Sequence, residues 1–189
     1  DPVTPLDETL QTLVDIVRAG KALYIGISRW PLDALKYAND FLRERGVPPL
    51  IFQGRLNLLD RAVQDEGIPA FCEAEGIGFI SFSALAQGLL TSRYLNGVPN
   101  GSRMSSGGSL HPDKLTPELL EYLNDLNGIA LERGDSLASM SLAWVLAQQG
   151  VTSVLVGART PEQFKESLRC IDLSLQESFE LPLYPHKVF

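Results

Sequence analysis

The stretch ALYIGIS, residues 22–28, is a short apolar run rich in strand-forming residues, and segments with helical periodicity lie on both sides of it. The preceding segment, residues 5–19, carries apolar side chains three or four positions apart and ends at Gly20. The following segment, residues 31–45, ends at a Gly-Val-Pro-Pro sequence that cannot continue a helix. An apolar strand between two helices is typical of a parallel sheet that is buried on both faces.

This alternation of helix and strand recurs along the whole chain. Repeated units of this kind form parallel sheets with right-handed crossovers, and we expect the helices on one side of the sheet. A closed (β/α)8 barrel needs eight strands and about 250 residues. The alternation therefore predicts an α/β fold of parallel βαβ units, and the chain is short by roughly one half of a complete (β/α)8 TIM-barrel type fold. Further helices are expected at 64–75, 117–133, 136–149 and 161–170, and four strands near 22–27, 50–53, 78–82 and 153–157, the last one ending at Val156.

The composition predicts a single globular domain over residues 1–189. Apolar residues make up 44% of the chain and charged residues 21%. The net charge is -7 and no run of Lys or Arg is present, so we expect no nucleic-acid partner. No apolar run approaches the roughly 20 residues of a membrane span, so we expect no membrane partner. The first residue is Asp1, not Met, which we interpret as a fragment or a processed chain.

Two cysteines and one irregular segment complete this outline. Cys72 and Cys170 lie in apolar, helical stretches and have neither CxxC spacing nor a neighbouring His cluster. We expect reduced, buried thiols in a cytoplasmic protein, and no metal site. Residues 97–115 are dense in Gly, Ser and Pro and predict a mobile loop.

Polar residues follow each expected strand, where the active sites of parallel α/β proteins lie. Hydroxyl, amide and guanidinium groups are frequent there, together with glycines that allow close backbone approach. This chemistry favours a phosphorylated cofactor over a hydrocarbon ligand. Structural roles remain open for several of these residues: Ser28 as a helix cap, Gln53 as a polar core residue, and Arg159 and Glu166 as surface residues.

Several ordered motifs resemble the aldo-keto reductase family, and together they cover the chain from Asp1 to about Leu175. The first 30 residues, ending in YIGISRW, are similar to the family pattern of a helix, a Gly-Lys turn and a strand. SFSALAQGLLTSRYL resembles the family segment SPLAQGLLTGKYL, and TSVLVGARTPEQFKES resembles its terminal segment. The resemblance is strongest to the bacterial branch that is similar to potassium-channel β-subunits and glyceraldehyde 3-phosphate reductases. It implies that this chain is the second half of the barrel and that the cofactor is NADPH.

The resemblance assigns four residues to the nicotinamide end of the cofactor. Ser28 matches the residue that holds the nicotinamide carboxamide, and Arg29 replaces the Asn that follows it in the family. Gln53 matches a Gln of the next strand that binds the same carboxamide. Phe82 occupies the position from which an aromatic ring stacks on the nicotinamide in many relatives.

The resemblance also implies a pyrophosphate turn and a loop that folds over the cofactor. Ser83, Leu85 and Gly88 match the turn that cradles the pyrophosphate. Ser102 and Arg103 match an Ser-Arg pair in the covering loop.

The adenosine end of the cofactor matches the last segment of the chain. Gly157 belongs to the family motif that leads into the final helix. Arg159, Gln163 and Glu166 match the group around the adenosine ribose and its 2′-phosphate. Ser167 replaces the Asn that contacts adenine in relatives.

The family reduces an aldehyde or ketone with an Asp, a general-acid Tyr, a Lys and a His, all of which precede the segment matching Asp1. The resemblance therefore implies an oxidoreductase whose catalytic residues are absent from this chain, which carries the cofactor-binding half. The alternative is a non-catalytic NADP-binding or interaction half-barrel module. Because the open edges of a half-barrel leave backbone groups unpaired, we expect a homo-oligomer unless another half covers them.

Overall fold

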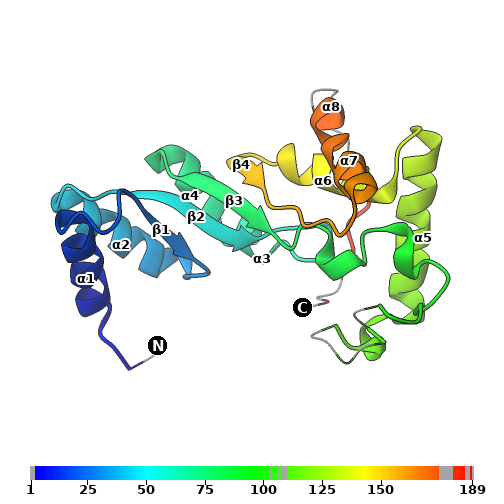
Figure 1. Ribbon diagram of the computed structural model, residues 1–189, viewed down its shortest axis with the longest axis horizontal. Helices are drawn as coiled ribbons and strands as arrows, with labels where there is room; N and C mark the ends of the chain where they lie inside the picture. The colour runs from blue at the N-terminus through cyan, green and yellow to red at the C-terminus, as the bar shows by residue number, and fades with distance from the viewer. Residues whose placement is uncertain are drawn as a thin grey trace.

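Four parallel strands form one sheet in the computed structural model, which describes residues 3–102, 104–105, 107, 110–174, 181–185 and 188. The strands lie side by side in the order in which they occur in the sequence (Figure 1). This arrangement confirms the predicted α/β fold and matches one half of a (β/α)8 barrel. The strands are β1 (Ile25–Ser28), β2 (Pro49–Arg55), β3 (Gly78–Phe82) and β4 (Val151–Val154).

Helices connect these strands and follow the last one. In α1 the apolar residues recur at helical spacing, and Leu10 and Val14 are buried on one face. Single 3-10 turns, η1 (Ala86–Gly88), η2 (Ser92–Tyr94) and η3 (Pro112–Lys114), lie between β3 and α5. The helices are α1 (Leu6–Arg18), α2 (Leu32–Glu44), α3 (Ala62–Asp65), α4 (Ile68–Glu75), α5 (Pro117–Glu132), α6 (Leu137–Leu146), α7 (Pro161–Leu168) and α8 (Cys170–Ser174).

The two faces of the sheet differ in burial. Ile27, Phe52 and Phe79 lie next to one another across three strands and are buried, and the two Phe rings stack with centroids 6.0 Å apart. On the opposite face, Gln53 and Ile80 are neighbours and both are only partly buried. Since α2, α4 and α6 pack against the sheet, the buried row is the helix-covered outer face and the open row is the inner face of the half-barrel.

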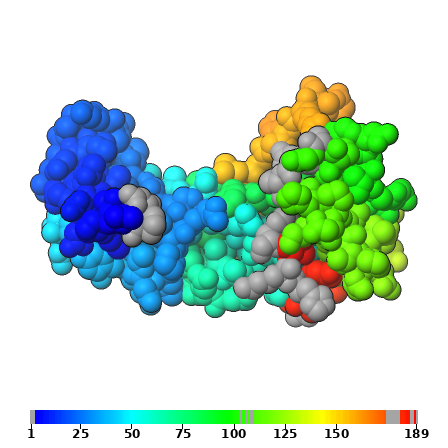
Figure 2. All heavy atoms as spheres, turned by 90° about the horizontal axis from the view of Figure 1, so that it is seen from below, coloured from blue at the N-terminus to red at the C-terminus, as the bar shows by residue number. Residues whose placement is uncertain are grey.

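The molecule is elongated because the sheet does not close. Figure 2 shows two raised ends, one formed by the blue residues near the N-terminus and one by green to orange residues, with a lower waist between them. Apolar side chains are exposed at both free edges of the sheet, namely Leu23 and Tyr24 before β1 and Leu155 and Val156 after β4. These edges are where further strands would pair in a complete barrel.

Several expected elements have different bounds in the structure; β1, for example, begins at Ile25 instead of residue 22. The helix expected at 64–75 is two helices, because Gly67 adopts a left-handed conformation (φ 77°) and Pro69 starts a new helical turn. The last strand ends at Val154 instead of Val156. After Val154, only the N–H of Leu155 still bonds to β3, at the Ser81 carbonyl (2.8 Å). Since β3 itself ends at Phe82, the following residues have no strand beside them.

Helix α6 occupies the centre of the core at the end where α5, α7 and α8 gather. Its residues Leu137–Val145 are all buried, including Trp144, and the helix contacts β4, α5, α7 and α8. Ser136 caps its first turn by accepting a hydrogen bond from the Ser139 N–H (3.1 Å). Although α6 is apolar on all sides, no helix in the described part of the chain is long and apolar enough to cross a bilayer.

The irregular segment 97–115 is partly packed into the core. Ser102, Met104 and Leu110 are buried within it. Burial of these side chains ties the segment to the rest of the domain at three points. Its mobility stays a prediction.

Candidate functional site

A cleft with a volume of about 670 Å³ lies at the carboxyl ends of β3 and β4. Its walls are the turn after β3, the segment after β4 and one face of α7. This is the position at which parallel barrels bind ligands. The cleft brings together eight of the residues predicted from the sequence: Ser83, Leu85, Gly88, Gly157, Arg159, Gln163, Glu166 and Ser167.

The turn after β3 has an unusual backbone. Ser83, Ala86 and Gln87 all have left-handed conformations, with φ values of 54°, 47° and 59°, and Gly88 follows at 101°. Left-handed residues that carry a Cβ cost about 1–3 kcal/mol each and persist only where the surroundings hold them. Such strain is typical of functional sites, and here three strained residues occur within five positions of the cleft wall.

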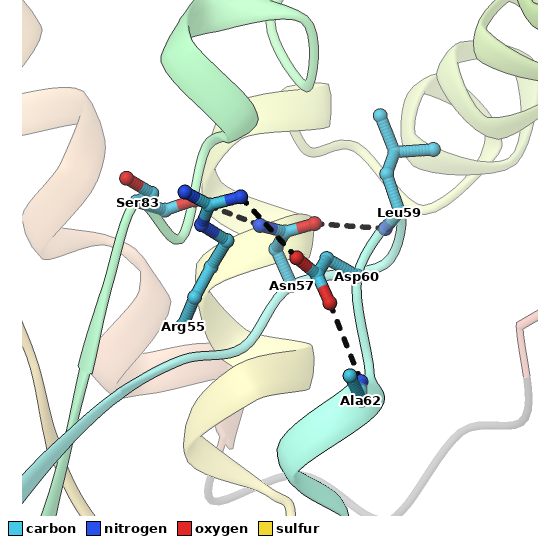
Figure 3. Close-up of polar contacts among 6 residues, drawn as sticks. All are labelled: Arg55, Asn57, Leu59, Asp60, Ala62 and Ser83. Atoms are coloured by element: carbon cyan, nitrogen blue, oxygen red, sulfur yellow. Dashed lines mark hydrogen bonds and ion pairs between the residues drawn. The ribbon is translucent and has the colours of Figure 1, made fainter. Parts of the chain in front are cut away.

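The loop after β2 is hydrogen-bonded to this turn (Figure 3). The Asn57 side chain donates from Nδ2 to the Ser83 carbonyl (3.0 Å) and accepts at Oδ1 from the Leu59 N–H (2.9 Å). In the same loop, Asp60 pairs with Arg55 (3.4 Å) and accepts from the Ala62 N–H (3.3 Å). The turn and the loop therefore form one hydrogen-bonded unit at the edge of the sheet.

The start of α7 forms the opposite wall. Thr160 caps the helix by accepting from the Gln163 N–H (3.3 Å), and Gln163 Oε1 accepts from the Arg159 N–H (2.9 Å). These reciprocal bonds resemble a capping box and fix the backbone that carries the exposed Arg159 side chain. The side-chain oxygen of Gln163 is thus engaged by the Arg159 N–H, and Arg159 is the cationic group that this helix start offers to an anion.

The residues assigned to the nicotinamide end lie at the ends of β1, β2 and β3, outside the lining of the cleft. The Gln53 carbonyl accepts from Ser28 Oγ (3.2 Å) and from the Arg29 N–H (3.1 Å). Arg29 has a left-handed backbone (φ 60°), and Ser28 does not cap a helix, since Pro31 occupies that position. The guanidinium of Arg55 lies over the ring of Phe82, 5.7 Å from its centroid.

Of the two residues assigned to the covering loop, Ser102 is described and does not line the cleft. Ser102 is buried, and its hydroxyl accepts from the Ser105 N–H (3.3 Å). Arg103 lies outside the described residues. In α7, Ser167 Oγ donates to the Gln163 carbonyl (3.0 Å). Glu166, the residue before it, is exposed and also lines the cleft.

Sequence reasoning missed three contributors to this site. Arg93 lines the cleft from η2. Thr160 is the cap of α7, and the pattern Thr-Pro-Glu-Gln at 160–163 carries the capping-box signal that identifies it. Asn57 follows β2, whereas Ser83 follows β3, and no local sequence pattern predicts the hydrogen bond between them.

The residues present fit a phosphorylated dinucleotide. Two guanidinium groups, Arg93 and Arg159, line one cleft together with hydroxyls of Ser83, Thr91 and Ser92. Arginine pairs favourably with phosphate because its planar fork of donors matches the phosphate oxygens. No group of three or more His, Cys, Asp or Glu residues suited to a metal ion occurs in the described part of the chain.

A parallel sheet of four strands in sequential order, with a polar cleft at the carboxyl ends of the last two, defines a TIM-barrel protein of which this chain forms one half. The family follows from the sequence: residues 1–179 match the Aldo/keto reductase family. The chain belongs to this family.

Individual relatives agree with the family assignment. The chain is 43% identical over 176 residues to the L-glyceraldehyde 3-phosphate reductases of Escherichia coli strain K12 and strain O157:H7. A crystal structure of a thermostable aldo-keto reductase in complex with the inhibitor epalrestat superposes with a TM-score of 0.66 at 24% identity, which supports the fold. In each comparison the match covers 91% of this chain and 51% of the relative, so the chain spans about half the length of the relatives it matches.

Proposed function

We propose that this chain is the cofactor-binding half of an NADPH-dependent oxidoreductase that reduces an aldehyde or ketone to an alcohol. The observation that carries the proposal is the cleft between the strained turn after β3 and the capped start of α7, with Arg93 and Arg159 in its walls. Membership of the Aldo/keto reductase family and the similarity to two bacterial reductases support the same reaction class.

Each wall of the cleft has a role in this proposal. Arg159, Gln163 and Glu166 would hold the adenosine ribose and its 2′-phosphate, and the backbone of the turn from Ser83 to Gly88 would receive the pyrophosphate. The bound NADPH supplies the hydride.

The nicotinamide end would lie toward the inner face of the sheet. There Gln53, with Ser28 and Arg29 beside it, would hold the carboxamide, and Phe82 would stack on the ring.

No tyrosine in the described part of the chain lines the cleft, so none is placed there to supply the proton that must reach the carbonyl oxygen. Burial raises the pKa of Tyr122 to about 12, so this hydroxyl is a poor acid at neutral pH. The hydroxyl of Tyr94 is buried without a hydrogen-bond partner in the described part of the chain. We therefore expect no carbonyl reduction by the 189-residue chain alone. The alternative function for the same cleft is that of a non-catalytic NADP-binding or interaction module. The free thiols of Cys72 and Cys170 support a cytoplasmic setting.

The experiment that tests the proposal is a fluorescence titration of the chain with NADPH and NADH at fixed ionic strength. Arg159→Ala should weaken NADPH binding by about 10- to 100-fold, because a charge-assisted contact to the 2′-phosphate is lost, and should leave NADH binding nearly unchanged. Lys165→Ala is the matched control, since it removes a positive charge from the same helix outside the cleft. Equal losses for both cofactors, or none for either, would remove Arg159 from the site. Failure of the wild-type chain to bind either cofactor would overturn the proposed function.

A further inference from the structure

Two buried polar side chains connect the loop after β2 to β3 and to the turn that follows β3. Ser81 Oγ donates to the Leu56 carbonyl (2.8 Å), and Asn57 Nδ2 donates to the Ser83 carbonyl (3.0 Å). Ser81 and Asn57 are both completely buried. Each segment therefore satisfies a polar group of the other, which buried polar groups require.

The turn depends on support from outside. Ser83, Ala86 and Gln87 have left-handed conformations that are unfavourable for residues with a Cβ. Within the turn, the Ser83 carbonyl accepts from the Ala86 N–H (2.8 Å), and the Asn57 bond reaches the same carbonyl from a neighbouring strand end. Asn57 thus acts on the atom at which the strained conformation begins.

Asn57 is itself held rigidly. Its Oδ1 accepts from the Leu59 N–H, and its backbone exchanges two hydrogen bonds with Asp60 (3.0 and 3.1 Å). Asp60 is in turn paired with Arg55 (Figure 3). Because these hydrogen bonds fix Asn57 in its loop, the position of the loop determines the position of the Ser83 carbonyl. Asn57 itself does not line the cleft.

We infer that Asn57 is a positioning residue for dinucleotide binding: it fixes the turn from Ser83 to Gly88 in the conformation that receives the pyrophosphate. The inference rests on the proposed function. It goes beyond that function because it assigns a role in ligand binding to a buried side chain on a different strand end, which acts through the backbone of the turn.

The decisive variant is Asn57→Asp. It preserves the oxygen that accepts from Leu59, and in its ionised form it has no donor for the Ser83 carbonyl. Asn39→Asp is a control, because Asn39 is a buried residue of α2 that donates from Nδ2 to Glu75 of α4 (3.0 Å) and does not line the cleft. Both variants place a carboxyl group where a buried amide donated a hydrogen bond.

Two measurements distinguish positioning from general destabilisation. In the ligand-free folded protein, hydrogen exchange of the Ala86 and Gly88 amides should become about 3- to 10-fold faster in Asn57→Asp, as expected for the loss of one buried hydrogen bond, and should not change in Asn39→Asp. NADPH and NADH should both bind about 3- to 10-fold more weakly to Asn57→Asp, by the same factor, because the pyrophosphate is common to both. Arg159→Ala, in contrast, should change the ratio between the two cofactors.

The outcomes separate this inference from the proposed function. In one outcome the wild type binds cofactor, and folded Asn57→Asp has the same affinity and the same amide exchange rates as the wild type. This outcome overturns the inference and leaves the proposed function intact. Absence of dinucleotide binding by the wild type overturns both. If Asn57→Asp does not fold, Asn57→Ala decides, since it removes the same donor without burying a carboxyl group: parallel weakening of both cofactors supports the inference, and wild-type behaviour overturns it.

Discussion

Gly150 lies between α6 and β4, at a point where the backbone of another element passes very close. Its φ is 79°, and a Cβ on this residue would lie 2.3 Å from the carbonyl oxygen of Pro69 at the start of α4. Backbone atoms of a helix cannot move aside as the end of a flexible side chain can. The packing of α4 beside the start of β4 therefore requires glycine at this position.

A matched pair of substitutions measures this close approach. Gly46 has a similar φ of 72° but has open space around its Cβ position. Gly46→Ala should lower the free energy of unfolding by about 1–2 kcal/mol, which is the cost of a left-handed alanine. Gly150→Ala should lower it by a further 1–3 kcal/mol, roughly, because of the overlap with Pro69. Urea unfolding of the two variants gives the difference, and equal losses would show that the contact with Pro69 is not limiting.

At the residue scale, the sequence indicated which residues lie at the carboxyl edge of the sheet, but not how the turn after β3 is held. Ser83 and Arg159 follow strands and carry the chemistry of a phosphate site, so their place at the carboxyl edge could be expected. The left-handed backbone of Ala86 and Gln87 could not, because neither residue type signals it. The contact between Asn57 and Ser83 depends on the register of two strands, which periodicity alone does not determine.

Helix α4 contributes Cys72 to the core, and this buried thiol makes stability depend on alkaline pH. Cys72 is completely buried, and burial raises the pKa of its thiol to about 11, above the ordinary value near 9. The folded state therefore keeps the proton over a range in which the unfolded chain loses it. The stabilisation is complete below about pH 9 and is lost as the pH rises to about 11.

Cys72→Ala should flatten this pH dependence. The free energy of unfolding of the wild type should fall more steeply between pH 9 and about 11 than that of the variant, whatever the two values are at neutral pH. Urea unfolding at a series of pH values measures both slopes. Burial also raises the pKa of Cys170 and of Tyr122, but these groups are present in both proteins and cancel in the comparison. Parallel slopes would show that the Cys72 thiol does not resist ionisation in the folded state.

Elements with a clear repeat were predicted to within a few residues, and the errors have local causes. Helix α2 was expected at 31–45 and spans Leu32–Glu44. The agreement is close because an apolar stripe defines the helix and the Gly-Val-Pro-Pro sequence ends it. The break between α3 and α4 was missed, although Gly67 and Pro69 mark it. The shortened β4 could not be predicted from its own residues, because its length is limited by where β3 turns away.

For the whole molecule, we propose self-association through the open edges of the sheet. Leu23 and Tyr24 at one edge and Leu155 and Val156 at the other expose apolar surface beside unpaired backbone groups. A chain whose mass is verified as 20.7 kDa should therefore sediment as a dimer or larger species.

Charged substitutions at the edges should shift this equilibrium toward the monomer. Tyr24→Lys and Val156→Lys each place a charge on an open edge, whereas Leu131→Lys places one on the exposed side of α5 and serves as the control. Sedimentation velocity over a range of concentrations should show dissociation in the two edge variants and wild-type behaviour in the control. A wild-type chain that remains a folded monomer at all concentrations would contradict the proposal.

The order of the strands also bears on how the chain can be made. Each strand pairs only with its neighbours in the sequence, so a nascent chain leaving the ribosome can add one βα unit after another without waiting for a distant segment. At every stage of such synthesis the most recent strand presents a new edge that receives the next one. Strand β4 is made only after α5 and α6. Of the three strand pairings, that of β3 with β4, at whose carboxyl ends the cleft lies, therefore forms last.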